Sequence, residues 1–123
     1  MTGSSTWSNA SELARTVESQ GFSGMLYTET GQVPWMQIAA AAMAAPSLTF
    51  TTGIAVAFPR SPMVSAQVAW ELASETNGKF RLGLGSQVKG HVVRRYSADF
   101  ERPARRLLDY VLAVKACFRA FRG

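Results

Sequence analysis

The chain has 123 residues, which is the ordinary size of a single domain. Hydrophobic residues make up 47% of it and charged residues 17%, below the roughly 25% typical of soluble domains. The sequence can therefore bury a sizeable core, and part of its surface is predicted to be covered by something else. The single cysteine, Cys117, excludes an intramolecular disulfide and agrees with a reducing compartment.

The formal net charge of +5 is concentrated in the last third of the chain. Residues 1–88 carry four basic and five acidic side chains, whereas residues 89–123 carry nine basic and three acidic ones. Such a basic stretch suits a phosphate group, an acidic partner or nucleic acid, and a solvated helix face explains it equally well. No known nucleic-acid-binding motif surrounds these residues, so we do not expect nucleic acid as a partner.

The sequence shows neither a secretion signal nor a membrane span. Residues 1–7 lack the positive charge and the apolar core of a signal peptide. The longest alanine-rich run, Met36 to Ala45, is too short to cross a bilayer. We therefore expect a cytoplasmic protein without membrane contact. No cluster of His, Asp or Glu has metal-ligand spacing with Cys117, so no metal site is predicted.

The first predicted element is a helix near the N-terminus. Asn9 and Glu12 have the spacing of a capping box, and apolar residues follow with helical periodicity. Gly21 is predicted to end this helix. Residues 1–9, before it, are polar and are predicted to be irregular or disordered.

The rest of the chain alternates between strands and helices that begin at a proline. The predicted strands cover residues 24–28, 48–56 and 80–85. The predicted helices cover residues 34–45, 61–76 and 103 onward. In the last helix, one apolar stripe is formed by Leu107, Val111, Val114, Phe118 and Phe121.

Strand–helix–strand alternation predicts parallel strands joined by right-handed crossovers. A doubly wound sheet and a (β/α)8 barrel both begin in this way, and periodicity does not separate them. Because a barrel needs eight strands and roughly 250 residues, this chain would form only part of one. No linker or change of composition marks a boundary, so residues 1–123 are predicted to form a single domain.

The loops after the carboxyl ends of the strands carry the residues best suited to chemistry. These loops are residues 28–30, 57–61 and 85–89. The glycines in the sequence LGLGS allow a ligand to approach the backbone closely, and exposed N–H groups favour anions. The segment is not a GxGxxG motif, because Val88 stands where the third glycine would fall.

Three segments of the chain together carry a resemblance: GFSGMLYTE, TTGIAVAFPRSPMVSAQVAWELASETNGKF and RLGLGSQVKGH. In this order and spacing they resemble the luciferase-like monooxygenase family, particularly its branch that uses the deazaflavin coenzyme F-420. The resemblance covers roughly residues 10–121 and is most specific between Gly53 and Ser86. It implies the N-terminal portion of a (β/α)8 barrel of the TIM type, with three to four parallel strands and flanking helices.

The resemblance also implies a cofactor site at the mouth of the barrel, with F-420 as the expected cofactor and FMN as the alternative. Glu29 falls where family members place an acidic or polar residue near the cofactor ring. Gly53 and Ile54 fall where members carry a bulge, often with a non-prolyl cis peptide, that backs the ring. The other implied cofactor-binding positions are Val56, Ala57, Gly85, Ser86 and Lys89.

Two residues are the candidates for acid/base catalysis. Glu29 could be a general base, although a hydrogen-bonding or capping role is as consistent with its position. Thr30 stands where many deazaflavin enzymes of the family keep a histidine, and a threonine hydroxyl cannot replace that group near neutral pH. His91, the only histidine, could do so if the loop after the third predicted strand folds inward, although a lone histidine is more often a surface residue.

The resemblance implies an oxidoreductase that transfers hydride to or from an unidentified small molecule in the complete family fold. Members usually begin with a strand that residues 1–9 do not supply, and 123 residues build less than half of the barrel. The alternative is therefore a truncated, non-catalytic remnant. An open sheet of parallel strands leaves both edges unpaired, so such a remnant is expected to associate with itself as a homo-oligomer through those edges.

Overall fold

The computed structural model describes residues 5–123. The chain divides into two compact units. The first unit consists of Met1–Ala55 and Glu71–Gly83, and the second consists of Val56–Trp70 and Leu84–Gly123. That residues 1–123 form a single domain stays a prediction. Within the described residues, no helix is both long enough and apolar enough to cross a membrane.

Helix α1 (Trp7–Ser19) begins earlier than the capping-box pattern predicts. Its N-cap is Thr6, whose side-chain oxygen accepts a hydrogen bond from the Asn9 backbone N–H at 3.0 Å. The prediction of Asn9 as the cap is wrong, because the Thr6 hydroxyl already satisfies one of the free N–H groups of the first turn. Of the segment predicted to be irregular, residues 7–9 are helical, and residues 1–4 lie outside the described residues. Gly21, with a φ of +86°, follows the helix as predicted.

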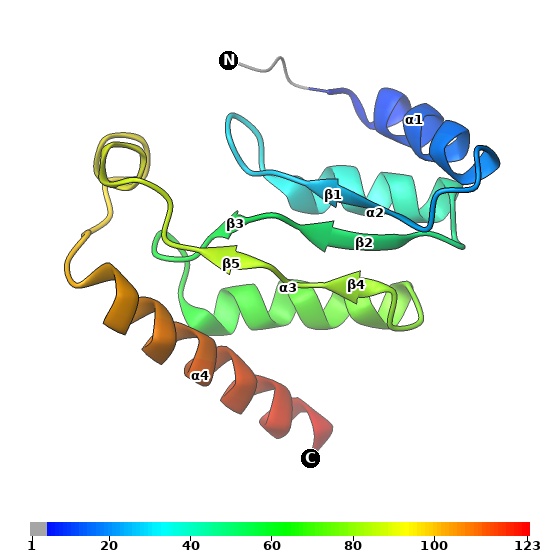
Figure 1. Cartoon of the computed structure of the whole chain (residues 1–123). Helices are drawn as coiled ribbons and strands as arrows, with labels where there is room; N and C mark the ends of the chain where they lie inside the picture. The colour runs from blue at the N-terminus through cyan, green and yellow to red at the C-terminus, as the bar shows by residue number, and fades with distance from the viewer. Residues whose placement is uncertain (1–4) are drawn as a thin grey trace. The chain divides into compact units, whose positions relative to one another are not determined.

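The first unit contains a sheet of three parallel strands in the order β1-β2-β4. The strands are β1 (Gly24–Tyr27), β2 (Thr49–Thr52) and β4 (Phe80–Arg81). Helix α2 (Pro34–Ala44) connects β1 to β2, begins at its proline as predicted, and lies beside the sheet (Figure 1). The predicted parallel strands with helical crossovers are therefore present in this unit.

One face of this sheet carries the core of the first unit. Phe50 on β2 is fully buried, and its register partners are Met25 on β1 and Phe80 on β4. Since side chains alternate between the two faces of a strand, Phe50 and Thr52 point to the same side, and both are buried. Further buried apolar residues of the unit are Ala10, Ala14, Ile38, Ala41, Ala45 and Leu48.

The opposite face of the same sheet is open. The register places Leu26, Thr51 and Arg81 in one row across the three strands. Leu26 is 62% exposed, and Arg81 is exposed as well. In a closed barrel this face would point to the interior, where side chains from the other strands would cover it.

Two of the predicted strands are each divided into two shorter ones. Residues 48–56 form β2 and β3 (Ala55–Val56), and residues 80–85 form β4 and β5 (Leu84–Gly85). The side chain of Thr52 bonds to Gly83 at both backbone atoms: its Oγ1 accepts from the Gly83 N–H and donates to the Gly83 carbonyl oxygen, each at 2.8 Å. A side chain thus takes the place of a backbone ladder between β2 and β4, which interrupts regular strand pairing. The prediction of continuous strands is wrong for this reason.

The second unit is built mainly from two helices. It contains the first part of α3 (Pro62–Glu75) and all of α4 (Pro103–Arg122), together with β5 and the short π-helix η1 (His91–Arg95). The Ser61 side chain caps α3, since its oxygen accepts a hydrogen bond from the Val64 N–H at 3.2 Å. The predicted stripe of α4 packs inward, with Val114 buried and Phe118 and Phe121 against Trp70 at ring distances of 6.0 and 5.3 Å.

Candidate functional site

Glu29, one of the two predicted catalytic residues, lies two residues after the end of β1 in the first unit. It is only 2% exposed, although the next residue along the chain is exposed. Its backbone N–H donates to the Ile54 carbonyl oxygen at 3.3 Å. Among the described residues, no buried side-chain oxygen or nitrogen lacks a hydrogen-bond partner.

Gly53 and Ile54 follow β2 in the same unit, so the structure brings them together with Glu29. The peptide bond between them is cis, as the family resemblance implies. The Gly53 N–H donates to the Tyr27 carbonyl oxygen at 2.7 Å, which ties this segment to the end of β1. A Cβ atom at residue 53 would lie 2.6 Å from the Leu26 side chain, an exposed group on the open face of the sheet. Glycine thus leaves room at the point where β1 and β2 end.

The other implied cofactor-binding residues belong to the second unit. The Ala57 N–H donates to the Gly85 carbonyl oxygen at 3.0 Å, which joins two of them directly. Val56 and Ala57 are fully buried, Gly85 and Ser86 are half-buried, and Lys89 is exposed. Each unit therefore assembles its own part of the predicted set at the carboxyl end of a strand.

His91, the second predicted catalytic residue, is the first residue of η1 in the second unit. Its backbone N–H donates to the Val88 carbonyl oxygen at 3.1 Å, and the residue is half-buried. Because Glu29 lies in the first unit and His91 in the second, the described structure does not place the two candidates in one site. Their catalytic roles stay predictions.

A buried polar contact in the second unit was not found from the sequence. The hydroxyl groups of Ser65 and Tyr110 lie 2.6 Å apart, and the Tyr110 hydroxyl also donates to the Ser61 carbonyl oxygen at 3.2 Å. Burial raises the pKa of Tyr110, and this effect is opposed by the hydrogen bond from Ser65 and by the charge of Arg60. Tyr110 is in phase with the apolar stripe of α4, which is the signal that could have revealed it.

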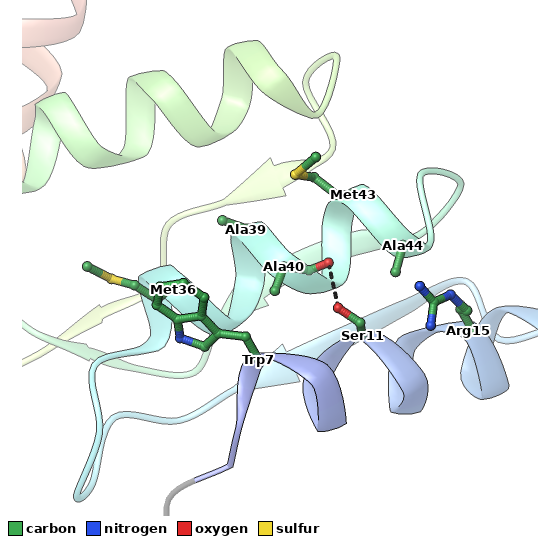
Figure 2. A pocket seen from close by; sticks show the side chains of 8 residues that line it. All are labelled: Trp7, Ser11, Arg15, Met36, Ala39, Ala40, Met43 and Ala44. Atoms are coloured by element: carbon green, nitrogen blue, oxygen red, sulfur yellow. Dashed lines mark hydrogen bonds between the residues drawn. The ribbon is translucent and has the colours of Figure 1, made fainter.

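A second feature missed from the sequence is a cavity of about 450 Å³ between α1 and α2, here called the α1/α2 groove (Figure 2). Helix α1 lines it with Trp7, Ser11 and Arg15. Helix α2 lines it with Met36, Ala39, Ala40, Met43 and Ala44. Trp7 lies beside Met36 at one end, and Arg15 lies near Ala44 at the other. The groove lies wholly in the first unit, and its lining residues do not include Glu29, Gly53 or Ile54.

Nearly the whole chain matches one known protein family. The model of the family described as luciferase-like monooxygenase matches residues 1–122. The chain belongs to the luciferase-like monooxygenase family. The family predicted from the three sequence segments is therefore confirmed.

Curated relatives of this luciferase-like chain occur in mycobacteria. The uncharacterized proteins Rv1360 of Mycobacterium tuberculosis and Mb1395 of Mycobacterium bovis are each 37% identical to it over 112 residues. The match covers 91% of this chain and 33% of each relative. The chain thus spans about a third of the length of these proteins.

Solved structures show the same fold. The monooxygenase RslO1 from Streptomyces bottropensis has a TM-score of 0.78 and 19% identity, with 88% of this chain and 35% of that chain covered. The oxygenating constituent of 3,6-diketocamphane monooxygenase from Pseudomonas putida, a type II Baeyer-Villiger monooxygenase in complex with FMN, has a TM-score of 0.77 and 16% identity. That match covers 89% of this chain and 35% of that chain. The predicted fold class, a partial barrel of parallel strands with flanking helices, is confirmed.

Proposed function

We propose that this luciferase-like chain forms part of the wall of a flavin-type cofactor site, with F-420 as the ligand and FMN as the competing candidate. The observation that supports the proposal is the meeting of Glu29 with the Gly53–Ile54 peptide, where the Glu29 N–H bonds to the Ile54 carbonyl oxygen at 3.3 Å. A related structure, the Pseudomonas putida oxygenating constituent, is described in complex with FMN.

The residues of the first unit suit a flat ring with polar edges. Residue 53 has no side chain, so bare backbone lies at the ends of β1 and β2, and the neighbouring exposed side chain of Leu26 is apolar and flexible. Glu29 supplies one buried carboxyl group at the border of this apolar surface.

When bound, such a cofactor accepts or donates hydride, and the protein orients it and excludes water. Under this proposal the backbone at residues 53 and 54 supports the ring, and the Glu29 carboxyl group orients a polar ring edge. Since Glu29 is buried and its backbone is tied to residue 54, it is pre-organised for this task. Substrate selection would depend on parts of the family fold beyond the third that this chain spans.

Titration of the chain with oxidised F-420 and with FMN, followed by cofactor fluorescence, tests the proposal. We expect saturable binding, tighter for F-420, and about tenfold weaker binding by Glu29→Gln because a charge-assisted hydrogen bond is lost. Glu12→Gln is the matched control, since Glu12 is exposed on α1, and it should bind like the unaltered chain. Tighter binding of FMN would reverse the choice of cofactor, and saturable binding of neither compound would overturn the proposal.

A second candidate is the non-catalytic, self-associating remnant. The observation that favours it is the open face of the sheet in the first unit. On this face, Leu26 of the edge strand β1 is 62% exposed. Contact through this edge would remove that apolar side chain from water and pair free backbone groups.

Light scattering of the chain over a range of concentrations tests this second candidate. We expect an oligomer that Leu26→Lys converts to a smaller species. A lysine at the sheet edge would have to be buried in the contact between chains, which disfavours strand pairing. Leu13→Lys, at a residue 55% exposed on α1, is the control. A mass that Leu26→Lys leaves unchanged would refute association through this edge.

A further inference from the structure

The second unit contains a cavity of its own, here called the α3/α4 cavity, with a volume of about 410 Å³. That volume lies within the roughly 300–1,000 Å³ that is typical of small-molecule sites. The cavity is lined by residues 58–62, which lead from β3 into the first turn of α3, and by Arg106, Asp109 and Tyr110 of α4. None of the predicted catalytic or cofactor-binding residues lines it, so neither candidate function uses this cavity.

Arg106 is held at the cavity by contacts that leave its charge without a carboxylate partner. Its guanidinium carbon lies 4.2 Å from the centre of the Phe58 ring, and its Nη1 donates to the Asp99 carbonyl oxygen. In the part of the chain that the structure describes, no carboxylate forms an ion pair with it. A half-buried cation is normally paired, because partial removal from water disfavours an isolated charge. The Arg106 guanidinium group is therefore fixed in position and suited to an anionic ligand.

Arg60 adds a second positive charge to the lining. Its Nη1 donates to the Val56 carbonyl oxygen at 3.0 Å, which fixes the side chain beside the loop that leads into α3. Burial raises the pKa of Tyr110, whereas the Ser65 hydrogen bond and the charge of Arg60 lower it, so this charge acts at the wall that α4 forms. Two guanidinium groups from distant segments of the chain thus line one cavity, and planar N–H groups of this kind bind phosphate oxygens in pairs.

The rest of the lining leaves this positive charge in excess. Asp109 is the one acidic residue among the lining residues, and its Oδ1 lies 3.4 Å from the Nε of Arg105, which offsets its charge. The other walls are mainly apolar, with Phe58 buried and Pro59 and Pro62 half-buried. The first turn of α3 carries a partial positive charge of the same sign as the two lining arginines. The cavity therefore combines a cationic centre with a stiff apolar wall.

We propose that the α3/α4 cavity binds the phosphate group of a small phosphomonoester. Arg106 and Arg60 contact the phosphate oxygens, and Pro59 and Pro62 pack against the organic part of the ligand. A phosphomonoester suits the site better than a carboxylate, because it offers three oxygens and close to two negative charges to the two guanidinium groups. The site shares no residue with the proposed cofactor wall, so it stands whether or not a flavin-type ligand binds.

Isothermal titration calorimetry of the chain with phenyl phosphate tests the site. Benzoate and phenol are the matched ligands, since they keep the ring and carry a carboxylate or no charge. We expect saturable binding of phenyl phosphate with a Kd on the order of 0.1–1 mM, weakened by added salt, with benzoate about tenfold weaker and phenol not bound. No saturable binding of phenyl phosphate, or benzoate bound as tightly as phenyl phosphate, would overturn the proposal.

Ser61→Asp tests whether binding takes place in this cavity. The Ser61 side chain caps α3 by accepting a hydrogen bond from the Val64 N–H, and an aspartate can accept the same bond, so the helix keeps its cap. The added carboxylate lies at the cavity and repels the phosphate, so binding of phenyl phosphate should weaken about tenfold or more. Gln67→Glu adds the same charge to α3 at an exposed residue outside the lining, and it should bind like the unaltered chain.

Arg106→Gln tests the guanidinium group itself. We expect binding of phenyl phosphate to weaken about tenfold, because a charge-assisted hydrogen bond is lost. Arg119→Gln, at an exposed arginine of the same helix outside the lining, should leave the affinity unchanged. Circular dichroism establishes that each variant is folded. If either folded variant, Ser61→Asp or Arg106→Gln, binds phenyl phosphate as tightly as the unaltered chain, the ligand lies elsewhere and the proposal is wrong.

Discussion

Phe50→Ala is expected to destabilise the chain by about 3–5 kcal/mol, because it removes a fully buried ring from the centre of the three-stranded sheet. The ring packs 6.4 Å from that of Tyr27, and its register partner on β4 is the buried Phe80. Backbone hydrogen bonds hold β2 between two neighbours, so the strands cannot close over the cavity without losing register. Domains of this size are stable by only about 5–15 kcal/mol, so the loss is a large share of the free energy of unfolding.

Phe22→Ala is the matched control for this measurement. Phe22 belongs to the same unit but is 62% exposed, so the same deletion should cost less than about 1 kcal/mol. Urea unfolding of both variants, followed by circular dichroism, gives the comparison. Equal midpoints for the two variants would mean that the core of the first unit does not lie on the Phe50 face of the sheet.

The sequence was sufficient for those parts of the fold that depend on local patterns. The helices that open at Pro34, Pro62 and Pro103 were predicted from the proline itself, because its fixed φ and missing N–H suit the first turn. The start of α1 was missed because Thr6 and Asn9 are both good caps and the pattern favoured the residue with a glutamate three positions later. That preference is small. The observed cap is Thr6, because its side-chain oxygen accepts a hydrogen bond from a free backbone N–H of the first turn.

Features that depend on distant residues were beyond local patterns. The breaks after Thr52 and Arg81 arise because a threonine hydroxyl bonds to a glycine 31 residues away. The meeting of Glu29 with Gly53–Ile54 was reached through family resemblance rather than spacing, and only the structure supplies the hydrogen bond between them. The α1/α2 groove was missed because the alanine-rich run was considered as a helix and as a possible membrane span, but not for the surface that it leaves exposed. Its outer surface becomes visible once Ile38 and Ala41 are seen to occupy the inner one.

Gly83→Ala is expected to destabilise the chain by about 2–4 kcal/mol, for a reason that reverses the sequence interpretation of LGLGS. That motif suggested glycines kept small for a ligand. In the structure, a Cβ atom at residue 83 would lie 2.0 Å from the Thr52 carbonyl oxygen, a backbone atom that cannot move aside as a side-chain tip can. The added methyl group must push β2 away, which lengthens both hydrogen bonds to the Thr52 hydroxyl and the 2.8 Å bond from the Ala55 N–H to the Gly83 carbonyl oxygen.

Gly90→Ala offers the opposite expectation from the same chemical change. Residue 90 has helical backbone angles, φ −58° and ψ −40°, and nothing lies within 4 Å of a Cβ atom built there. Alanine should therefore stabilise the chain by about 0.4–1 kcal/mol, since it restricts the unfolded state without strain in the folded one. Thermal unfolding of the two variants, run beside the F-420 titration, separates the two explanations for Gly83. If the Gly83→Ala chain keeps its stability but loses cofactor binding, residue 83 must be small to admit the ligand. If the chain loses stability, residue 83 must be small because β2 approaches it closely.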